Sequence, residues 1–111
     1  MPDDRLPTGL LVEATLTPLN ARGLYYYIQQ KGNHASGLML VKLNGLKGKV
    51  RLRTQQRDFM EDTLLWVDAL AEEPLEDPAA DAYIQRAQQT DPDLWVIEIE
   101  DPEMNNPFEE L

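Results

Sequence analysis

Four runs of residues between positions 24 and 68 have the character of strands. The first, Leu24–Lys31, is rich in aromatic and β-branched residues, and the side chains of the first and the third, Lys49–Gln55, alternate between two faces. Both features are typical of half-buried strands. The connections between the runs are short and carry turn signals such as Asn44-Gly45. Because short connections most simply join antiparallel neighbours, the pattern predicts an antiparallel β-meander of about four strands. The four predicted strands are Leu24–Lys31, Leu38–Leu43, Lys49–Gln55 and Leu64–Asp68.

The C-terminal half predicts a helix followed by a last strand. Asp77-Pro78 joins a capping residue to a proline suited to a first helical turn, and the helix is expected to end near Thr90. A final strand over Leu94–Glu100 would place Trp95, Ile97 and Ile99 on one side. We expect this side to pack against the apolar stripe of the helix, and the fold class to be α+β. The stripe consists of Ala80, Tyr83, Ile84 and Ala87.

The segment before the first strand has two interpretations. Apolar residues recur at helical spacing between positions 12 and 19, and Gly23 stands where a helix often ends. Pro18 disfavours one continuous helix, but Thr17 could cap a short new turn with Pro18 in its first position. We therefore predict an N-terminal helix and keep a strand over Leu10–Leu16 as the alternative.

These elements predict one folded unit with two peripheral segments. Residues 1–8 contain two prolines and three charges, and we expect an irregular lead-in there. Residues 9–101 hold every predicted helix and strand and are expected to form a single α+β domain. Residues 102–111 are acidic and turn-rich, and we expect them to form a flexible tail.

Charge and composition narrow the environment of the protein. The chain has 20 acids against 10 bases, a net charge of −10, no cysteine, and no apolar stretch near the ~20 residues of a membrane span. The absence of cysteine removes any need for an oxidising compartment, and residues 1–16 do not resemble a signal peptide. We therefore expect a cytoplasmic protein without a membrane partner. The acidic excess also disfavours nucleic acid as a partner.

Nucleophiles and bases are too sparse for the common hydrolytic mechanisms. Ser36 is the only serine and His34 the only histidine, and both stand in one turn. That is a poor frame for a nucleophile, a base and an orienting group. A zinc site needs several Cys or His ligands, and no glycine-rich phosphate loop occurs. We therefore predict no catalytic residue of this type and no cofactor, and expect His34 to be a solvated turn residue.

Basic residues are concentrated in one part of the chain. Residues 31–57 contain seven bases and no acid, whereas residues 68–111 contain fourteen acids and one base. On an extended strand, alternate bases would stack on one face beside tyrosines of a neighbouring strand. Such a surface could bind an acidic partner or a nucleic-acid backbone. The alternative, which we favour, is that the acidic half of the same chain neutralises these bases. The candidate interaction surface comprises Lys47, Lys49, Arg51, Arg53, Tyr25 and Tyr27.

Five carboxylates crowd the last predicted strand and its start. Oxygen-rich clusters can hold Ca²⁺ or Mg²⁺, and paired carboxylates can perform acid–base catalysis. The cluster is therefore a candidate metal or hydrolase site. The alternative, which we favour, is the solvated face of a half-buried strand with no bound metal. The candidate residues are Asp91, Asp93, Glu98, Glu100 and Asp101.

Three stretches of the chain follow a family pattern. They are ADAYIQRAQQTDPDLWVIEIED at Ala80–Asp101, LNARGLYYYIQQKG followed by LMLVKLN, and the LLW of residues 64–66. These stretches resemble a bacterial family, the domain-of-unknown-function family 1491, over most of residues 9–101. Asn33 departs from the pattern, in which an Asp is expected after the glycine. The resemblance implies a length and an order of elements, and it implies no activity.

Together these observations favour a non-catalytic module that docks on another protein through the sheet edge or the acidic tail. Two alternatives remain. One is a carboxylate-based metal-dependent enzyme or hydrolase, and the other is a nucleic-acid-binding protein that uses the basic strand 47–53. A deep pocket lined by the acids would indicate the enzyme, whereas an exposed sheet edge would indicate the module.

Overall fold

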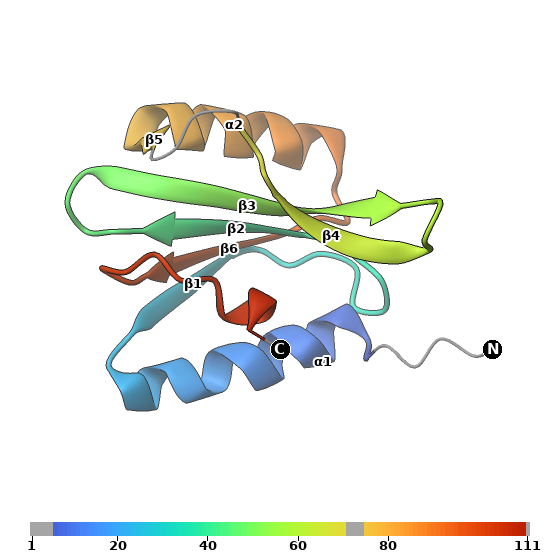
Figure 1. Cartoon of the computed structure of the whole chain (residues 1–111), viewed down its shortest axis with the longest axis horizontal. Helices are drawn as coiled ribbons and strands as arrows, with labels where there is room; N and C mark the ends of the chain where they lie inside the picture. Colours follow the sequence, from blue (N-terminus) through green and yellow to red (C-terminus); the bar gives the residue numbers. More distant parts are fainter. Residues whose placement is uncertain (1–5, 71–74, 111) are drawn as a thin grey trace.

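A mixed six-stranded sheet separates two helical layers in the computed structural model, which describes residues 6–70 and 75–110 (Figure 1). No helix in these stretches is long and apolar enough to span a membrane. The helix α1 (Thr8–Leu16) continues into the 3₁₀ helix η1 (Thr17–Arg22), and both lie on one face of the sheet. The helix α2 (Asp77–Thr90) covers the other face. The predicted α+β class, with an N-terminal helix and a C-terminal helix followed by a strand, is confirmed.

The order of the strands differs from the predicted meander. β6 lies between β1 and β2, antiparallel to the first and parallel to the second. The meander is therefore confirmed for β2, β3 and β4, but β1 and β2 are not neighbours. The reason is that Trp95, Val96 and Ile97 are all buried, and a strand buried on both faces belongs inside a sheet. The strands are β1 (Tyr25–Gln30), β2 (Met39–Asn44), β3 (Lys49–Asp58), β4 (Thr63–Asp68), β5 (Leu75–Glu76), which pairs with β3, and β6 (Trp95–Glu100).

The N-terminal segment is helical, so the alternative strand over Leu10–Leu16 is wrong. The chain accommodates Pro18 by ending α1 at Leu16 and placing the proline in the first turn of η1. Thr17 does not cap that turn with its side chain. Its hydroxyl instead donates a 2.7 Å hydrogen bond back to the carbonyl of Glu13. Gly23 ends η1 with a φ of 78°, a left-handed conformation that glycine adopts without strain.

The sheet has a separate apolar core on each face. The stripe of α2 packs on Leu40, Val50, Leu52 and Val96, as the helical spacing predicts. The alternate residues of β6 point the other way, toward α1, and this corrects the expectation that they pack against α2. Alternation alone could not assign the partner, because it shows which side chains of β6 share a face and not which helix covers that face. The core beside α1 consists of Val12, Leu16, Leu19, Met39, Val41, Leu43, Trp95, Ile97, Ile99 and Phe108.

The C-terminal segment, which we expected to be flexible, folds back onto the α1 side of the sheet in residues 102–110. The 3₁₀ helix η2 (Pro107–Glu109) places Phe108 in the core, only 4% exposed. The Phe108 ring stacks on Trp66 with a centroid separation of 6.2 Å and an interplanar angle of 27°. Burying a large aromatic side chain stabilises the packed position of the segment.

Candidate functional site

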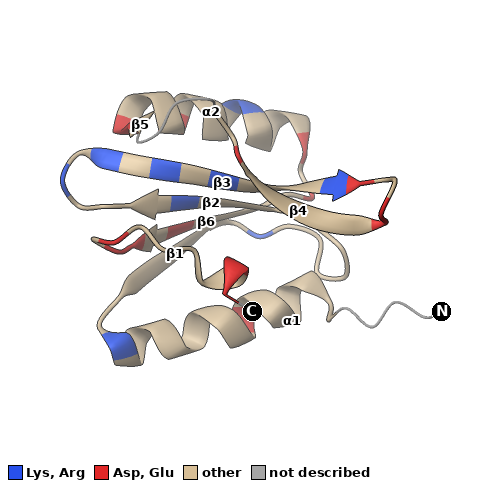
Figure 2. Ribbon diagram, in the orientation of Figure 1, with Lys and Arg blue, Asp and Glu red and all other residues tan. Residues whose placement is uncertain are grey.

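Three of the four candidate bases lie on β3, and each of them faces an acidic residue (Figure 2). Lys49 forms an ion pair with Glu76 of β5. Arg51 lies 3.9 Å from Asp68 of β4, and Arg53 lies 2.7 Å from the same carboxylate. The fourth base, Lys47, lies in the exposed loop between β2 and β3. The acidic half of the chain therefore neutralises the basic strand, which supports the alternative that we favoured.

The structure does not bring the candidate tyrosines to the basic side of the sheet. Tyr27 of β1 pairs with Glu98 of β6, Glu98 with Lys42 of β2, and Lys42 with Leu52 of β3. Paired residues share a face of the sheet, so Tyr27 lies on the α2 side with Leu52. Tyr25 lies on the same side, because it is two residues away. Lys49, Arg51 and Arg53 lie on the opposite side, so the six candidate residues form no single surface.

Arg53 anchors the C-terminal segment to the sheet. Its guanidinium donates hydrogen bonds of 2.9 Å and 2.7 Å to the two carboxylate oxygens of Glu109. The Asn106 side chain also donates to Glu109, at 2.8 Å. The hydrogen bond from Arg53 lowers the pKa of Glu109, and Asn106 adds to the effect, while burial opposes it. One carboxylate of the acidic tail, Glu109, is therefore already paired with the basic strand of its own chain.

Glu109→Gln is expected to make the protein less sensitive to acid. The pKa of Glu109 in the folded state lies below its ordinary value of 4.5. The ion pair with Arg53 therefore stabilises the fold above pH 4.5, and this stabilisation is lost as the pH falls through the lower, folded-state pKa. Urea denaturation between pH ~3 and ~7 should show a shallower acid loss for Glu109→Gln than for the parent. Glu110→Gln, at the exposed neighbour, should keep the parental profile, and identical profiles for all three would contradict the assignment.

The five candidate carboxylates do not assemble into one site. Asp91 and Asp93 precede β6, whereas Glu100 and Asp101 stand at its far end. Asp101 is buried, and its carboxylate accepts backbone hydrogen bonds from Glu103 and Asn105. Within residues 6–70 and 75–110, no group of three or more His, Cys, Asp or Glu is arranged to hold a metal ion. These residues therefore give no geometric support to the metal-dependent enzyme.

Glu98, the remaining member of this set, belongs to a buried lysine site that the sequence did not reveal. Lys42 of β2 is only 4% exposed, and its ammonium nitrogen lies 2.6 Å from Asp77, 2.9 Å from Asp81 and 3.9 Å from Glu98. Burial opposes the charged form of Lys42, but the three carboxylates outweigh this cost and raise its pKa. Asp77 and Asp81 stand on α2, so the site fastens that helix to the sheet. In the sequence, the available signal of this buried site was the single lysine in the apolar run LMLVKLN.

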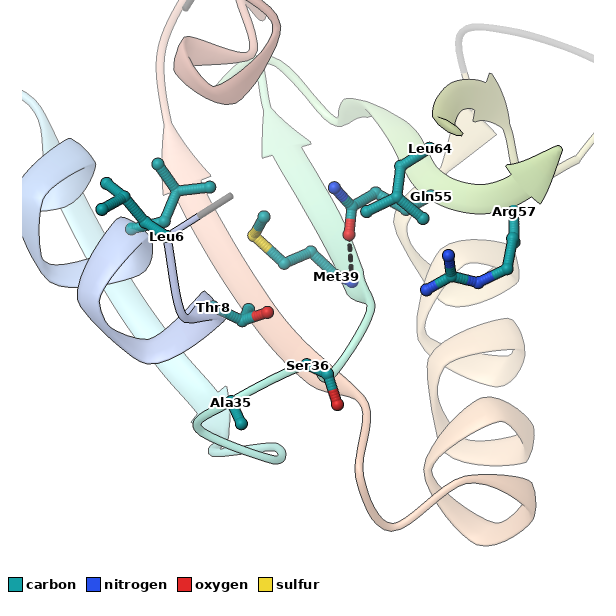
Figure 3. Close-up of a pocket in the computed structure, with 9 residues that line it drawn as sticks. Leu6, Thr8, Ala35, Ser36, Met39, Gln55, Arg57 and Leu64 are labelled. Atoms are coloured by element: carbon teal, nitrogen blue, oxygen red, sulfur yellow. Dashed lines mark hydrogen bonds between the residues drawn. The ribbon is translucent and has the colours of Figure 1, made fainter. Parts of the chain in front are cut away.

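A cavity of about 260 Å³ lies between the start of α1 and the β3–β4 hairpin (Figure 3). Its walls are mainly apolar, with Leu6, Met39 and Leu64 around the opening. Gln55 fixes one wall, because its side-chain oxygen accepts a 3.0 Å hydrogen bond from the backbone N–H of Met39. Arg57 pairs with Leu64 across the hairpin and supplies the charge of the cavity. The predicted strand ended at Gln55, whereas β3 runs to Asp58 and so brings Arg57 to this wall.

The tip of the same hairpin, residues 59–62, presents two large apolar side chains to solvent. Phe59 is 85% exposed and Met60 is 95% exposed. The Asp58 carboxylate accepts hydrogen bonds from the backbone N–H groups of Met60, at 3.0 Å, and Glu61, at 3.3 Å. These bonds fix the turn that carries both side chains. The sequence predicts only a short connection between two strands here, although the adjacent Phe and Met were an available signal of an exposed apolar tip.

Comparisons with solved structures show the same fold in related proteins. The crystal structure of a DUF1491 family protein from Caulobacter crescentus CB15 shares 30% identity and a TM-score of 0.78, with 94% of each chain covered. An NMR structure of a DUF1491 family protein from that organism shares 29% identity and a TM-score of 0.78, covering 92% of this chain and 91% of the other. The solution structure of protein Atu0922 from A. tumefaciens shares 26% identity and a TM-score of 0.70, covering 87% and 86%.

A search of curated proteins found no match. A comparison with protein families agrees with the structural comparisons. The profile of the family described as "Protein of unknown function (DUF1491)" matches residues 6–109, which is nearly the whole chain and includes the hairpin, the cavity and η2. The resemblance in the sequence is thereby confirmed, and the chain belongs to the DUF1491 family.

Proposed function

We propose that this protein is a non-catalytic module that binds another protein through the end of the sheet formed by the β3–β4 hairpin. The hairpin surface consists of the tip residues Phe59 and Met60, the exposed Leu6, and the adjoining cavity. The observation that carries the proposal is the exposure of Phe59 and Met60, 85% and 95%, on a turn that hydrogen bonds hold in place.

An exposed apolar tip of this kind is unfavourable in an isolated protein. Burying apolar surface contributes roughly 25 cal/mol per Å², and contiguous exposed apolar patches mark interaction sites in soluble proteins. Phenylalanine and methionine are also enriched in protein–protein interfaces. Because the Asp58 carboxylate holds the turn, the two side chains are positioned before a partner arrives. This pre-organisation reduces the entropy that binding must overcome.

The same surface includes a sheet edge, which is one of the two docking regions that we expect from the sequence. In the described part of the chain β4 pairs only with β3, so its outer edge has no strand partner. Leu65 of β4 is also exposed, on the face of the strand opposite the cavity-lining Leu64. The other region, the acidic tail, is held by Arg53. The hairpin end is therefore better suited to a partner than the tail.

The test compares partners captured by three tagged forms of the protein in its native cell. The Phe59→Ser/Met60→Ser variant should lose a partner that the parent retains, because exposed hot-spot side chains of this size contribute roughly 2 kcal/mol or more each. The control is Tyr25→Ser/Tyr27→Ser, which changes two exposed aromatic residues at the opposite sheet edge. It should retain the partner. A partner set that is the same for all three forms would contradict the proposal.

A further inference from the structure

We propose that the cavity beside the hairpin binds the C-terminal residue of the partner chain, with the apolar side chain inside and the terminal carboxylate on Arg57. The proposal rests on the proposed function, because it identifies which part of the partner the hairpin surface receives. Three properties of the cavity lead to this occupant: its volume, its charge, and the closeness of its apolar and cationic walls.

The volume suits one amino-acid side chain. At about 260 Å³ the cavity is smaller than the roughly 300–1,000 Å³ of most small-molecule sites. It is larger than an apolar cavity of roughly 150 Å³ that can hold benzene. The walls provided by Leu6, Leu11, Met39 and Leu64 are apolar, so they favour an aliphatic or aromatic group.

The charge of the cavity suits an anion, although the protein is strongly acidic. Among residues 6–70 and 75–110, no carboxylate lines it, while the chain as a whole has 20 acids and 10 bases. The hollow beside α2 includes Asp91, and the hollow between α1 and β1 includes Glu13. Here Arg57 turns its guanidinium toward the middle of the cavity (Figure 3).

Arg57 can exchange its present contact for a ligand. The guanidinium of Arg57 lies 3.9 Å from the carboxylate of Asp62, and the side chain of Asp62 is 91% exposed. Such exposed pairs contribute roughly 0–1 kcal/mol, whereas a guanidinium can hold a carboxylate with two parallel hydrogen bonds. Gln55 adds a donor, because its oxygen is used by Met39 and its amide nitrogen can still donate.

The closeness of these features identifies a chain terminus. The apolar walls and the Arg57 guanidinium share one cavity the size of a side chain, so the apolar group and the carboxylate must belong to one residue. Asp and Glu have no apolar side chain, and an internal Leu or Phe has no carboxylate. A C-terminal residue has both on one Cα atom, and capture of a terminal carboxylate is an established way of binding peptides. The rest of the partner would then lie along the hairpin surface.

The experiment uses two pools of random hexapeptides, one with a free C-terminal carboxylate and one amidated, passed over the intact protein. Peptides with Leu, Ile, Val, Phe or Met in the last position should be enriched about tenfold from the first pool and not from the second. Titration of the isotope-labelled protein with the retained free-acid pool should shift amide signals of Thr8, Met39, Gln55 and Leu64. No enrichment at the last position, equal enrichment from the amidated pool, or signal shifts at other residues would each overturn the proposal. Cavity shifts with octanoate but none with the free-acid peptides would overturn it in favour of a small amphipathic acid.

Arg57→Gln is the matched variant, and it should weaken binding of the retained peptides at least about tenfold, which corresponds to about 1.4 kcal/mol. Lys47→Gln removes the same charge from the exposed loop between β2 and β3 and should change the affinity less than twofold. Equal affinities of parent and Arg57→Gln would overturn the carboxylate contact. In the cell, a partner that is lost with Phe59→Ser/Met60→Ser but kept by Arg57→Gln would leave the interaction module intact and overturn only this inference.

Discussion

Trp95→Ala is expected to lower the free energy of unfolding by roughly 3–5 kcal/mol, the usual range for truncating a large buried aromatic side chain. Trp95 is 5% exposed and belongs to the core beside α1. Its indole N–H donates a 2.9 Å hydrogen bond to the carbonyl of Asn33. The substitution therefore leaves a cavity in the core and removes the tie that holds the turn after β1. Both losses act in the same direction.

Thermal and urea denaturation measure this effect, with Tyr27→Ala as the control. Tyr27 is an exposed aromatic residue on the neighbouring strand β1, and its truncation should cost less than about 0.5 kcal/mol. For a domain of this size, 1 kcal/mol shifts the melting temperature by roughly 4 °C or more. Trp95→Ala should therefore melt at least ~12 °C below the parent. A melting temperature within ~2 °C of the parent would show that Trp95 does not support the core.

Local patterns in the sequence identified most of the elements, but they could not order the strands. Alternation of apolar residues marks a strand whose two faces differ, and that signal found β1, β3 and the last strand. The position of β6 between β1 and β2 depends on its burial on both faces. In the sequence, Glu98 and Glu100 suggest a solvated face of the strand. In the structure, the Glu98 carboxylate instead contacts Lys42 of β2 on one side and Gln29 of β1 on the other. Long-range contacts of this kind leave no local periodicity.

The candidate site was missed for related reasons. The cavity joins the start of α1 to the far end of the β3–β4 hairpin, so Leu6 and Arg57 have no recognisable spacing in the sequence. Charge counting did predict that the acidic half neutralises the basic strand, because seven bases and fourteen acids in one small domain must lie close together. It could not identify Glu109 as the partner of Arg53, since that pair depends on Phe108 entering the core.

Replacing Asp77 and Asp81 together with asparagine is expected to cost roughly 3–5 kcal/mol, the range observed when a buried charge loses its partner. The Lys42 ammonium is buried and lies 2.6 Å and 2.9 Å from these two carboxylates. The aspartate side chains are 50% and 55% exposed, so they need the pair much less than the lysine does. The loss therefore arises from Lys42, which among the described residues would keep only Glu98, at 3.9 Å, as a counter-charge.

Lys42→Met is the matched control for this double variant. Methionine has a similar length and no charge. The aspartate side chains, 50% and 55% exposed, remain hydrated, except at the buried Oδ1 of Asp77. Volume-conserving changes of this kind usually cost less than about 1.5 kcal/mol, and replacing a buried ion pair by apolar groups can be neutral. The single change at the lysine should thus be milder than the double change at its partners. The reverse order would show that the carboxylates, and not the lysine, depend on the pair.

The pH dependence of stability separates the loss of the charge partners from a general weakening of α2. In the parent, the pKa of Lys42 is raised above 10.5, so its charge stabilises the fold below that pH and this stabilisation is lost only as the pH rises through the raised value. In the double variant, burial would act almost unopposed and lower the pKa of Lys42 below 10.5. The unfolded state of the double variant would then bind more protons than its folded state, so the free energy of unfolding of this variant should rise with pH. Urea denaturation should therefore show a smaller difference in the free energy of unfolding between parent and double variant at pH ~9.5 than at pH ~7. A difference that is the same at both pH values would show that the two aspartates support α2 without holding the charge of Lys42.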